Sequence, residues 1–64
     1  DKNLSDKLTQ TETTVAMLYH RNWNIKDIAE HMQITERNVL NHIQIIFAKL
    51  GVSSKEEFEK YMEQ

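Results

Sequence analysis

The 64-residue sequence contains no cysteine and no proline, and it has a single glycine. Without cysteine, neither a disulfide nor a thiolate-bound zinc ion can stabilise the fold, so packing between helices must do so. The scarcity of proline and glycine, the residues that most often interrupt helices, favours a compact helical bundle. No apolar run approaches the roughly 20 residues that cross a bilayer, and no signal-peptide pattern is present. We therefore expect a cytoplasmic protein without a membrane partner.

The length is sufficient for one domain, whose small core yields roughly 3–5 kcal/mol of net stability. Because the first residue is Asp1 rather than methionine, we expect the chain to be part of a longer protein. Its formal net charge of −2 is unfavourable for binding nucleic acid, where neutralising phosphates supplies the non-specific affinity. The acidity is uneven, however, because residues 53–64 carry a net charge of −2 and residues 35–49 carry +1.

Capping patterns predict an all-α four-helix bundle with helices at about residues 9–20, 25–31, 35–50 and 54–62. The expected N-caps are Thr9, with Glu12 completing a capping box, then Asn24, Thr35 and Ser54, with Glu57 completing a second box. Asn22 and Gly51 are expected to adopt the left-handed conformation that ends helices. Residues 1–7 are interpreted as a linker or frayed tail, and residues 8–64 as the domain. The short turn at residues 32–34 predicts a helix-turn-helix.

The stretch at residues 35–50 has one apolar face, suited to the core, and one polar face, suited to the surface. Helical spacing gathers an apolar stripe on one face, formed by Val39, Ile43, Ile46 and Leu50 with Phe47 on its flank. The opposite face carries Arg37, Asn41, Gln44 and Ala48 and no acid. Asparagine and glutamine pair with adenine in the major groove, and arginine pairs with guanine. This face therefore suits the reading of DNA, although a helix with a merely solvated polar face would look the same.

Four motifs in order connect the sequence to a known family. They are LT-x-x-E at Leu8–Glu12, KDIA at Lys26–Ala29, M-x-IT-x-x-NV-x-x-H at Met32–His42 and KLGV at Lys49–Val52. Together they resemble the LuxR-type (GerE) helix-turn-helix domain over about residues 8–58. The resemblance implies a sequence-specific DNA-binding output domain at the C-terminal end of a bacterial response regulator of a two-component system. A quorum-sensing receptor is the other possible context.

The resemblance also implies that the third helix enters the major groove and that the fourth pairs with a second copy. The residues expected to contact bases are Arg37, Asn38, Leu40, Asn41 and Gln44, and those expected to contact the DNA backbone are Lys26, Thr35 and Lys49. The residues expected to form a dimer face are Phe58, Tyr61 and Met62. Leu40 departs from the family pattern, which often has lysine there, so we expect it to contact a thymine methyl group.

Other functions find less support in the sequence. The three histidines lack ligand spacing and there is no catalytic constellation, so we expect no metal, no cofactor and no enzymatic activity. Trp23 is expected to cover the core rather than to stack on a ligand. Two alternatives to the DNA-binding regulator remain. One is a promoter-recognition module that resembles region 4 of a sigma factor and also binds RNA polymerase, and the other is an acidic protein-interaction module without DNA binding.

Overall fold

Helix starts in this chain are set by short polar side chains. The computed structural model describes residues 7–63, which form α1 (Gln10–His20), α2 (Ile25–Met32), α3 (Glu36–Leu50) and α4 (Lys55–Met62) and no strand. At each start the N-cap side chain accepts a hydrogen bond from a backbone N–H three residues later. These N-caps are Thr9, Asn24, Thr35 and Ser54, with distances of 3.2, 2.8, 3.1 and 3.1 Å. The all-α expectation and the four caps are confirmed, whereas the expected tail lies outside the described residues apart from Lys7.

The two expected capping boxes have different outcomes. At α1 the box is complete, because the Glu12 carboxylate also accepts from the Thr9 N–H at 3.0 Å. At α4 the return bond is displaced by one residue. The Glu57 carboxylate accepts from the Ser53 N–H at 2.8 Å and from the Ser53 hydroxyl at 3.1 Å, rather than from the Ser54 N–H. The expected second box is therefore wrong in this detail, since the carboxylate reaches past the cap to the preceding residue.

Helix ends rely on three residues with a left-handed backbone. Asn22 (φ 69°) follows α1 and Gly51 (φ 74°) ends α3, both as expected. Gln33 (φ 60°) ends α2 and was not anticipated, because glutamine is not a residue that marks this conformation. The reversal at Gln33 lets the Ile34 N–H donate to the Ala29 carbonyl at 3.0 Å. This bond closes the turn that joins α2 to α3.

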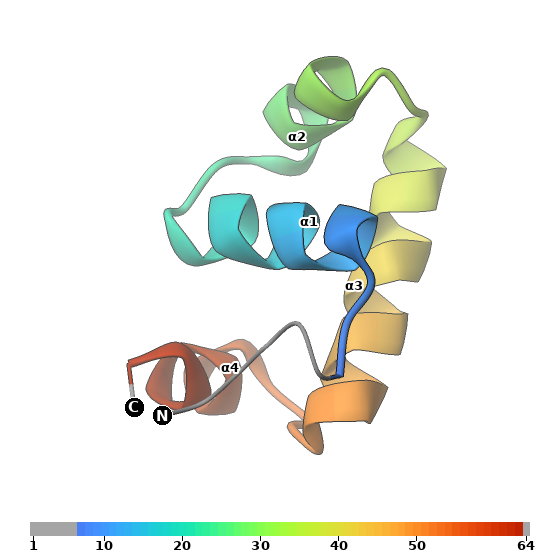
Figure 1. The fold of residues 1–64 in the computed structure, drawn as a ribbon. Helices are drawn as coiled ribbons and strands as arrows, with labels where there is room; N and C mark the ends of the chain where they lie inside the picture. The colour runs from blue at the N-terminus through green and yellow to red at the C-terminus, as the bar shows by residue number, and fades with distance from the viewer. Residues whose placement is uncertain (1–6, 64) are drawn as a thin grey trace.

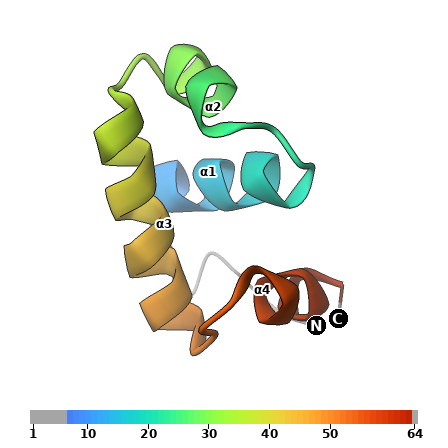
Figure 2. The same ribbon diagram turned by 180° about the vertical axis from the view of Figure 1, so that it is seen from behind.

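The longest helix, α3, runs along one side of the molecule, and the other helices lie across it. In both views α1 lies between α2 and α4, with α2 near the start of α3 and α4 near its end (Figures 1 and 2). Each helix contributes to one buried cluster, whose largest fully buried side chains are Phe58, Ile28, Ile46, Val15 and Val39. No helix among the described residues is long and apolar enough to span a membrane.

Phe58 anchors α4 against the rest of the bundle. Its ring stacks on Phe47 of α3 with centroids 5.4 Å apart, and it lies 5.5 Å from the ring of Tyr19 in α1. The side chain is 0% exposed. The placement of Phe58 on a dimer face is therefore corrected, because a side chain without exposed surface cannot reach a second copy. Tyr61 and Met62 are half-buried against the same core, so part of each is at the surface.

Candidate nucleic-acid interface

The two faces of α3 separate in the structure as their chemistry predicts. The four buried residues of this helix are Val39, Ile43, Ile46 and Leu50, the same residues as the predicted apolar stripe. All five expected base-contact residues are exposed, namely Arg37, Asn38, Leu40, Asn41 and Gln44. Ala48 is also exposed on this side, one helical turn beyond Gln44. The amide and guanidinium groups thus lie on a surface that no other part of the described chain covers.

The expected backbone-contact residues lie at two helix starts and one helix end. Lys26 is exposed in the first turn of α2, and Thr35 is exposed as the N-cap of α3. The Thr35 hydroxyl accepts from the Asn38 N–H at 3.1 Å, which leaves its own hydrogen free to donate to an acceptor such as a phosphate oxygen. Helix N-termini favour anions through their unpaired N–H groups. The arrangement at the start of α3 therefore suits contact with a phosphate.

Lys49 at the end of α3 has a structural partner that the sequence patterns do not reveal. Its ammonium group lies 2.8 Å from the Glu12 carboxylate of α1, and that carboxylate is buried. The hydrogen bond from Lys49, followed by the one from the Thr9 N–H, lowers the pKa of Glu12 below its ordinary value. One carboxylate thus caps α1 and ties it to the last turn of α3. Since an ammonium group has three donors, Lys49 can hold Glu12 and still meet a phosphate.

The acidic residues of α4 do not lie over the exposed face of α3. α4 packs near the C-terminal end of α3, whereas Arg37 and Asn41 belong to the N-terminal half of that helix, which lies near α2 (Figures 1 and 2). Part of the negative charge of α4 is paired with positive charge on the same helix. Glu59 lies 3.4 Å from Lys55 Nζ one turn earlier in the same helix, and its other carboxylate oxygen lies 2.7 Å from the His20 Nδ1 atom of α1. The carboxylates of α4 therefore lie away from the N-terminal half of α3, where the nearby exposed acids are Glu36 in the first turn of α3 and Asp27 in the first turn of α2.

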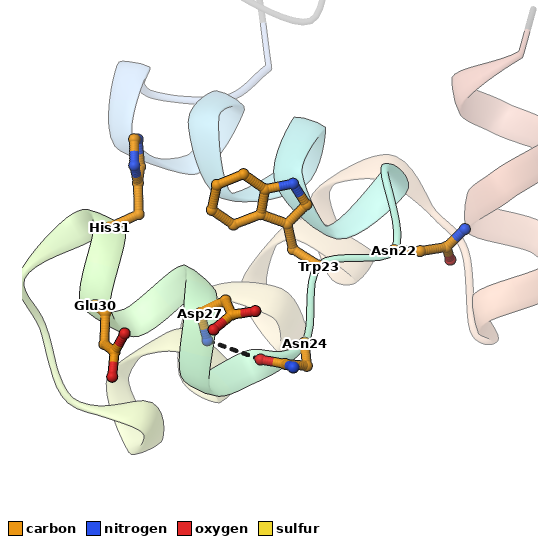
Figure 3. A pocket seen from close by; sticks show the side chains of 6 residues that line it. All are labelled: Asn22, Trp23, Asn24, Asp27, Glu30 and His31. Atoms are coloured by element: carbon orange, nitrogen blue, oxygen red, sulfur yellow. Dashed lines mark hydrogen bonds between the residues drawn. The ribbon is translucent and has the colours of Figure 1, made fainter.

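A shallow depression lies between α2 and the loop that precedes it (Figure 3). It is lined by Asn22, Trp23, Asn24, Asp27, Glu30 and His31. The Trp23 ring meets the edge of His31 with centroids 5.6 Å apart and is 37% exposed. The indole therefore packs beside His31 of α2 with part of its surface exposed, and that it also covers the core stays a prediction. In Figure 3 Glu30 points away from the indole, so the lining residues do not converge on one point.

Within residues 7–63 there is no group of three or more histidine, cysteine, aspartate or glutamate side chains that could hold a metal ion. His42 is half-buried on the flank of α3. Its Nδ1 atom is buried without a hydrogen-bond partner among the described residues.

Sequence reasoning did not assign any function to Ile45. This residue is 45% exposed on α3, and Leu40 on the same helix is 49% exposed. The helical period could have revealed Ile45, because it falls one turn after Asn41 and outside the buried stripe.

Comparison with known families agrees with the geometry. The sequence model of the family described as "Bacterial regulatory proteins, luxR family" (GerE) matches residues 6–62, which is nearly the whole chain. Neither the curated proteins nor the solved structures contain a match to this chain.

Proposed function

The chain belongs to the luxR family of bacterial regulatory proteins, and from this membership and the exposed face of α3 we propose that it binds specific DNA sequences. In this proposal it is the output domain of a transcriptional regulator, with α3 in the major groove. Two copies bind a two-fold-related site. We further propose that the regulator is a cytoplasmic response regulator, with RNA polymerase as a further partner at the promoter.

One observation carries the proposal: α3 buries its whole apolar stripe and leaves Arg37, Asn41 and Gln44 exposed. Asparagine and glutamine can each exchange two hydrogen bonds with adenine, and arginine can donate two to guanine. Asn38 lies at the start of the helix, where it can reach either a phosphate or a base edge. Leu40 supplies an apolar contact suited to a thymine methyl group.

Affinity in this proposal comes from the groups that meet phosphates. Lys26 supplies a positive charge at the start of α2, and Thr35 supplies a hydroxyl at the start of α3. Lys49 adds its remaining donors at the far end of α3. With few cations and a net charge of −2, one copy should bind weakly, and two copies on adjacent half-sites should bind more tightly.

The dimer face proposed for α4 consists of the exposed parts of Tyr61 and Met62. Both side chains are half-buried against the core, so each has surface left for a partner. The area they offer is small, so self-association of the chain alone should be weak and reinforced by DNA.

The proposal is tested by selecting bound duplexes from a random pool and then measuring affinities for the selected sequence. Asn41→Ala and Gln44→Ala should each lose about 1–3 kcal/mol of binding free energy and relax the preference at one base position. Gln10→Ala, which removes an exposed glutamine from α1, is the matched control and should change neither quantity. If both α3 variants kept the affinity and base preference of the wild type, α3 would not be the reading helix.

The same experiment separates the alternatives. Self-association without selection of any duplex would support the acidic protein-interaction module, for which the net charge of −2 is the supporting observation. A strictly monomeric chain that binds core RNA polymerase would support the sigma-like module.

A further inference from the structure

Two large apolar side chains are exposed on the proposed reading helix, and only one of them has a role so far. Four large hydrophobic residues among those described are exposed: Met17 43%, Trp23 37%, Leu40 49% and Ile45 45%. Met17 and Trp23 lie on separate elements, whereas Leu40 and Ile45 share α3. A single exposed apolar residue is ordinary on a protein surface, so the significance of Ile45 depends on where it lies.

Around the axis of α3, the two apolar residues flank the polar groups. At about 100° per residue, Ile45 lies about 40° beyond Asn41, and Leu40 lies about 40° on the other side of Gln44. The two apolar residues are thus about 140° apart and enclose Arg37, Gln44 and Asn41 between them. Ala48 lies within the same arc and is small enough to let the groove wall approach. When the polar groups at the middle of this arc contact bases, the exposed side chains of Leu40 and Ile45 at its two sides can also reach the bases.

From this placement we propose that Ile45 is a specificity-determining residue that contacts the C5-methyl group of a thymine, as a counterpart to Leu40. The inference rests on the proposed function. In the major groove, the thymine methyl is the apolar feature that an aliphatic side chain can recognise. Ile45 offers no hydrogen bond and its β-branched side chain has little rotamer freedom to lose on contact.

The spacing of Leu40 and Ile45 along α3 predicts the spacing of the two thymines in the DNA. Leu40 and Ile45 are five positions apart, which corresponds to about 7.5 Å along the helix axis. Because a helix in the major groove is inclined to the DNA axis, this length corresponds to no more than about two base-pair steps of 3.4 Å. The selected sequence should therefore contain two thymines, on either strand, within about two steps of each other, with the bases read by Asn41 and Gln44 beside or between them.

The test replaces the thymines of the selected duplex by deoxyuridine, one position at a time. Deoxyuridine lacks only the methyl group and keeps the same hydrogen-bonding atoms. At one position the wild-type chain should lose about three- to fivefold in affinity, as expected for one apolar contact of this size. Ile45→Ala should bind the thymine duplex about as weakly as the wild type binds the deoxyuridine duplex, and its affinity should not change further when deoxyuridine replaces thymine at that position. Ile45→Val should keep part of the sensitivity.

Met17→Ala, which shortens an equally exposed apolar side chain on α1, is the control and should behave as the wild type does. Because thymine and deoxyuridine are compared within each variant, any change in folding stability cancels from the ratio. The inference is overturned if Ile45→Ala remains as sensitive as the wild type at every position, or if the wild type is sensitive at none. Either result would leave the proposed function intact, whereas failure to select any duplex would overturn both.

Discussion

The buried carboxylate of Glu12 offers a quantitative test of how the bundle is held together. It accepts hydrogen bonds from the Thr9 N–H at 3.0 Å and from Lys49 Nζ at 2.8 Å, so it joins the first turn of α1 to the last turn of α3. Glu12→Ala removes both bonds. Glu12→Gln keeps an oxygen that can accept from Thr9 and Lys49 but removes the charge. Comparison of the two variants therefore separates the capping contribution from the charge.

The expected magnitude follows from these contacts. Loss of the hydrogen bond between the Glu12 carboxylate and the Thr9 N–H costs about 0.5–1.5 kcal/mol, and loss of an ion pair with a partly exposed lysine costs about 0.2–1 kcal/mol. Glu12→Ala should therefore lower the free energy of unfolding at pH 7 by about 1–2 kcal/mol, with the Thr9 cap itself retained. Each kcal/mol corresponds to about 4–8 °C in Tm for a domain of this size. Glu12→Gln should lose less, and a cycle with Lys49→Met should reveal non-additive losses.

The pH dependence has a definite sign. The pKa of Glu12 is lowered in the folded chain, first by the hydrogen bond from Lys49 and then by the one from Thr9. The stabilisation is therefore fully present above the ordinary pKa of 4.5 and is lost as the pH falls through the lower folded pKa. Urea unfolding followed by circular dichroism should show the difference between wild type and Glu12→Gln shrinking below about pH 4.5.

Glu56→Gln, at an exposed glutamate of α4, is the control and should change the free energy of unfolding little at either pH. A difference between wild type and Glu12→Gln that stayed constant down to pH 3 would refute the role assigned to the charge. No loss in Glu12→Ala at pH 7 would refute the role assigned to the carboxylate as a whole.

Three further outcomes are expected. Lys26→Gln should weaken binding to all duplexes alike and reduce the slope of log affinity against log salt by about 0.9, measured over a salt series; an effect confined to one sequence would contradict a backbone contact. Gly51→Ala should destabilise the chain by about 1 kcal/mol in urea unfolding, because φ at this position is +74° and alanine is strained there. An added Cβ would meet no atom within 4 Å, so the cost comes from the backbone conformation alone. An unchanged stability would argue against that conformation. Met62→Glu should weaken self-association in sedimentation experiments. Because Met62 is half-buried against the core, the variant should also lose some stability, so association is compared under conditions where both chains are folded. Equal association of both folded chains would remove Met62 from the dimer face.

Local features of the fold could be predicted because their signals lie within a few residues. Thr9, Asn24, Thr35 and Ser54 each cap a helix through a bond that spans three residues, so the sequence around each start contains the cap and its partner. The apolar stripe of α3 was equally readable, because fifteen residues give the helical period several repeats. The family motifs then indicated the function of the opposite face.

Features that depend on distant contacts could not be predicted in the same way. Glu12 and Lys49 are 37 residues apart, and nothing in either local pattern links them. On the eight-residue helix α4, three apolar side chains do not reveal which one faces inward; the stack of Phe58 on Phe47 decides it. The contact of Trp23 with His31 depends on how the loop before α2 packs on that helix, which the left-handed conformation expected at Asn22 does not specify. The helical period places Ile45 outside the apolar stripe, but its exposure depends on how the other helices pack against α3.

The central claim is that the exposed face of α3 meets the bases of DNA. Titration of the chain with its selected duplex, followed by NMR chemical shifts, tests this claim residue by residue. We predict the largest changes at the side-chain amides of Asn41 and Gln44 and along the backbone from Thr35 to Lys49, with further changes on α4 limited to the surroundings of Tyr61 and Met62, where two copies pair. Changes confined to α4, or none on α3 at low salt, would contradict the claim.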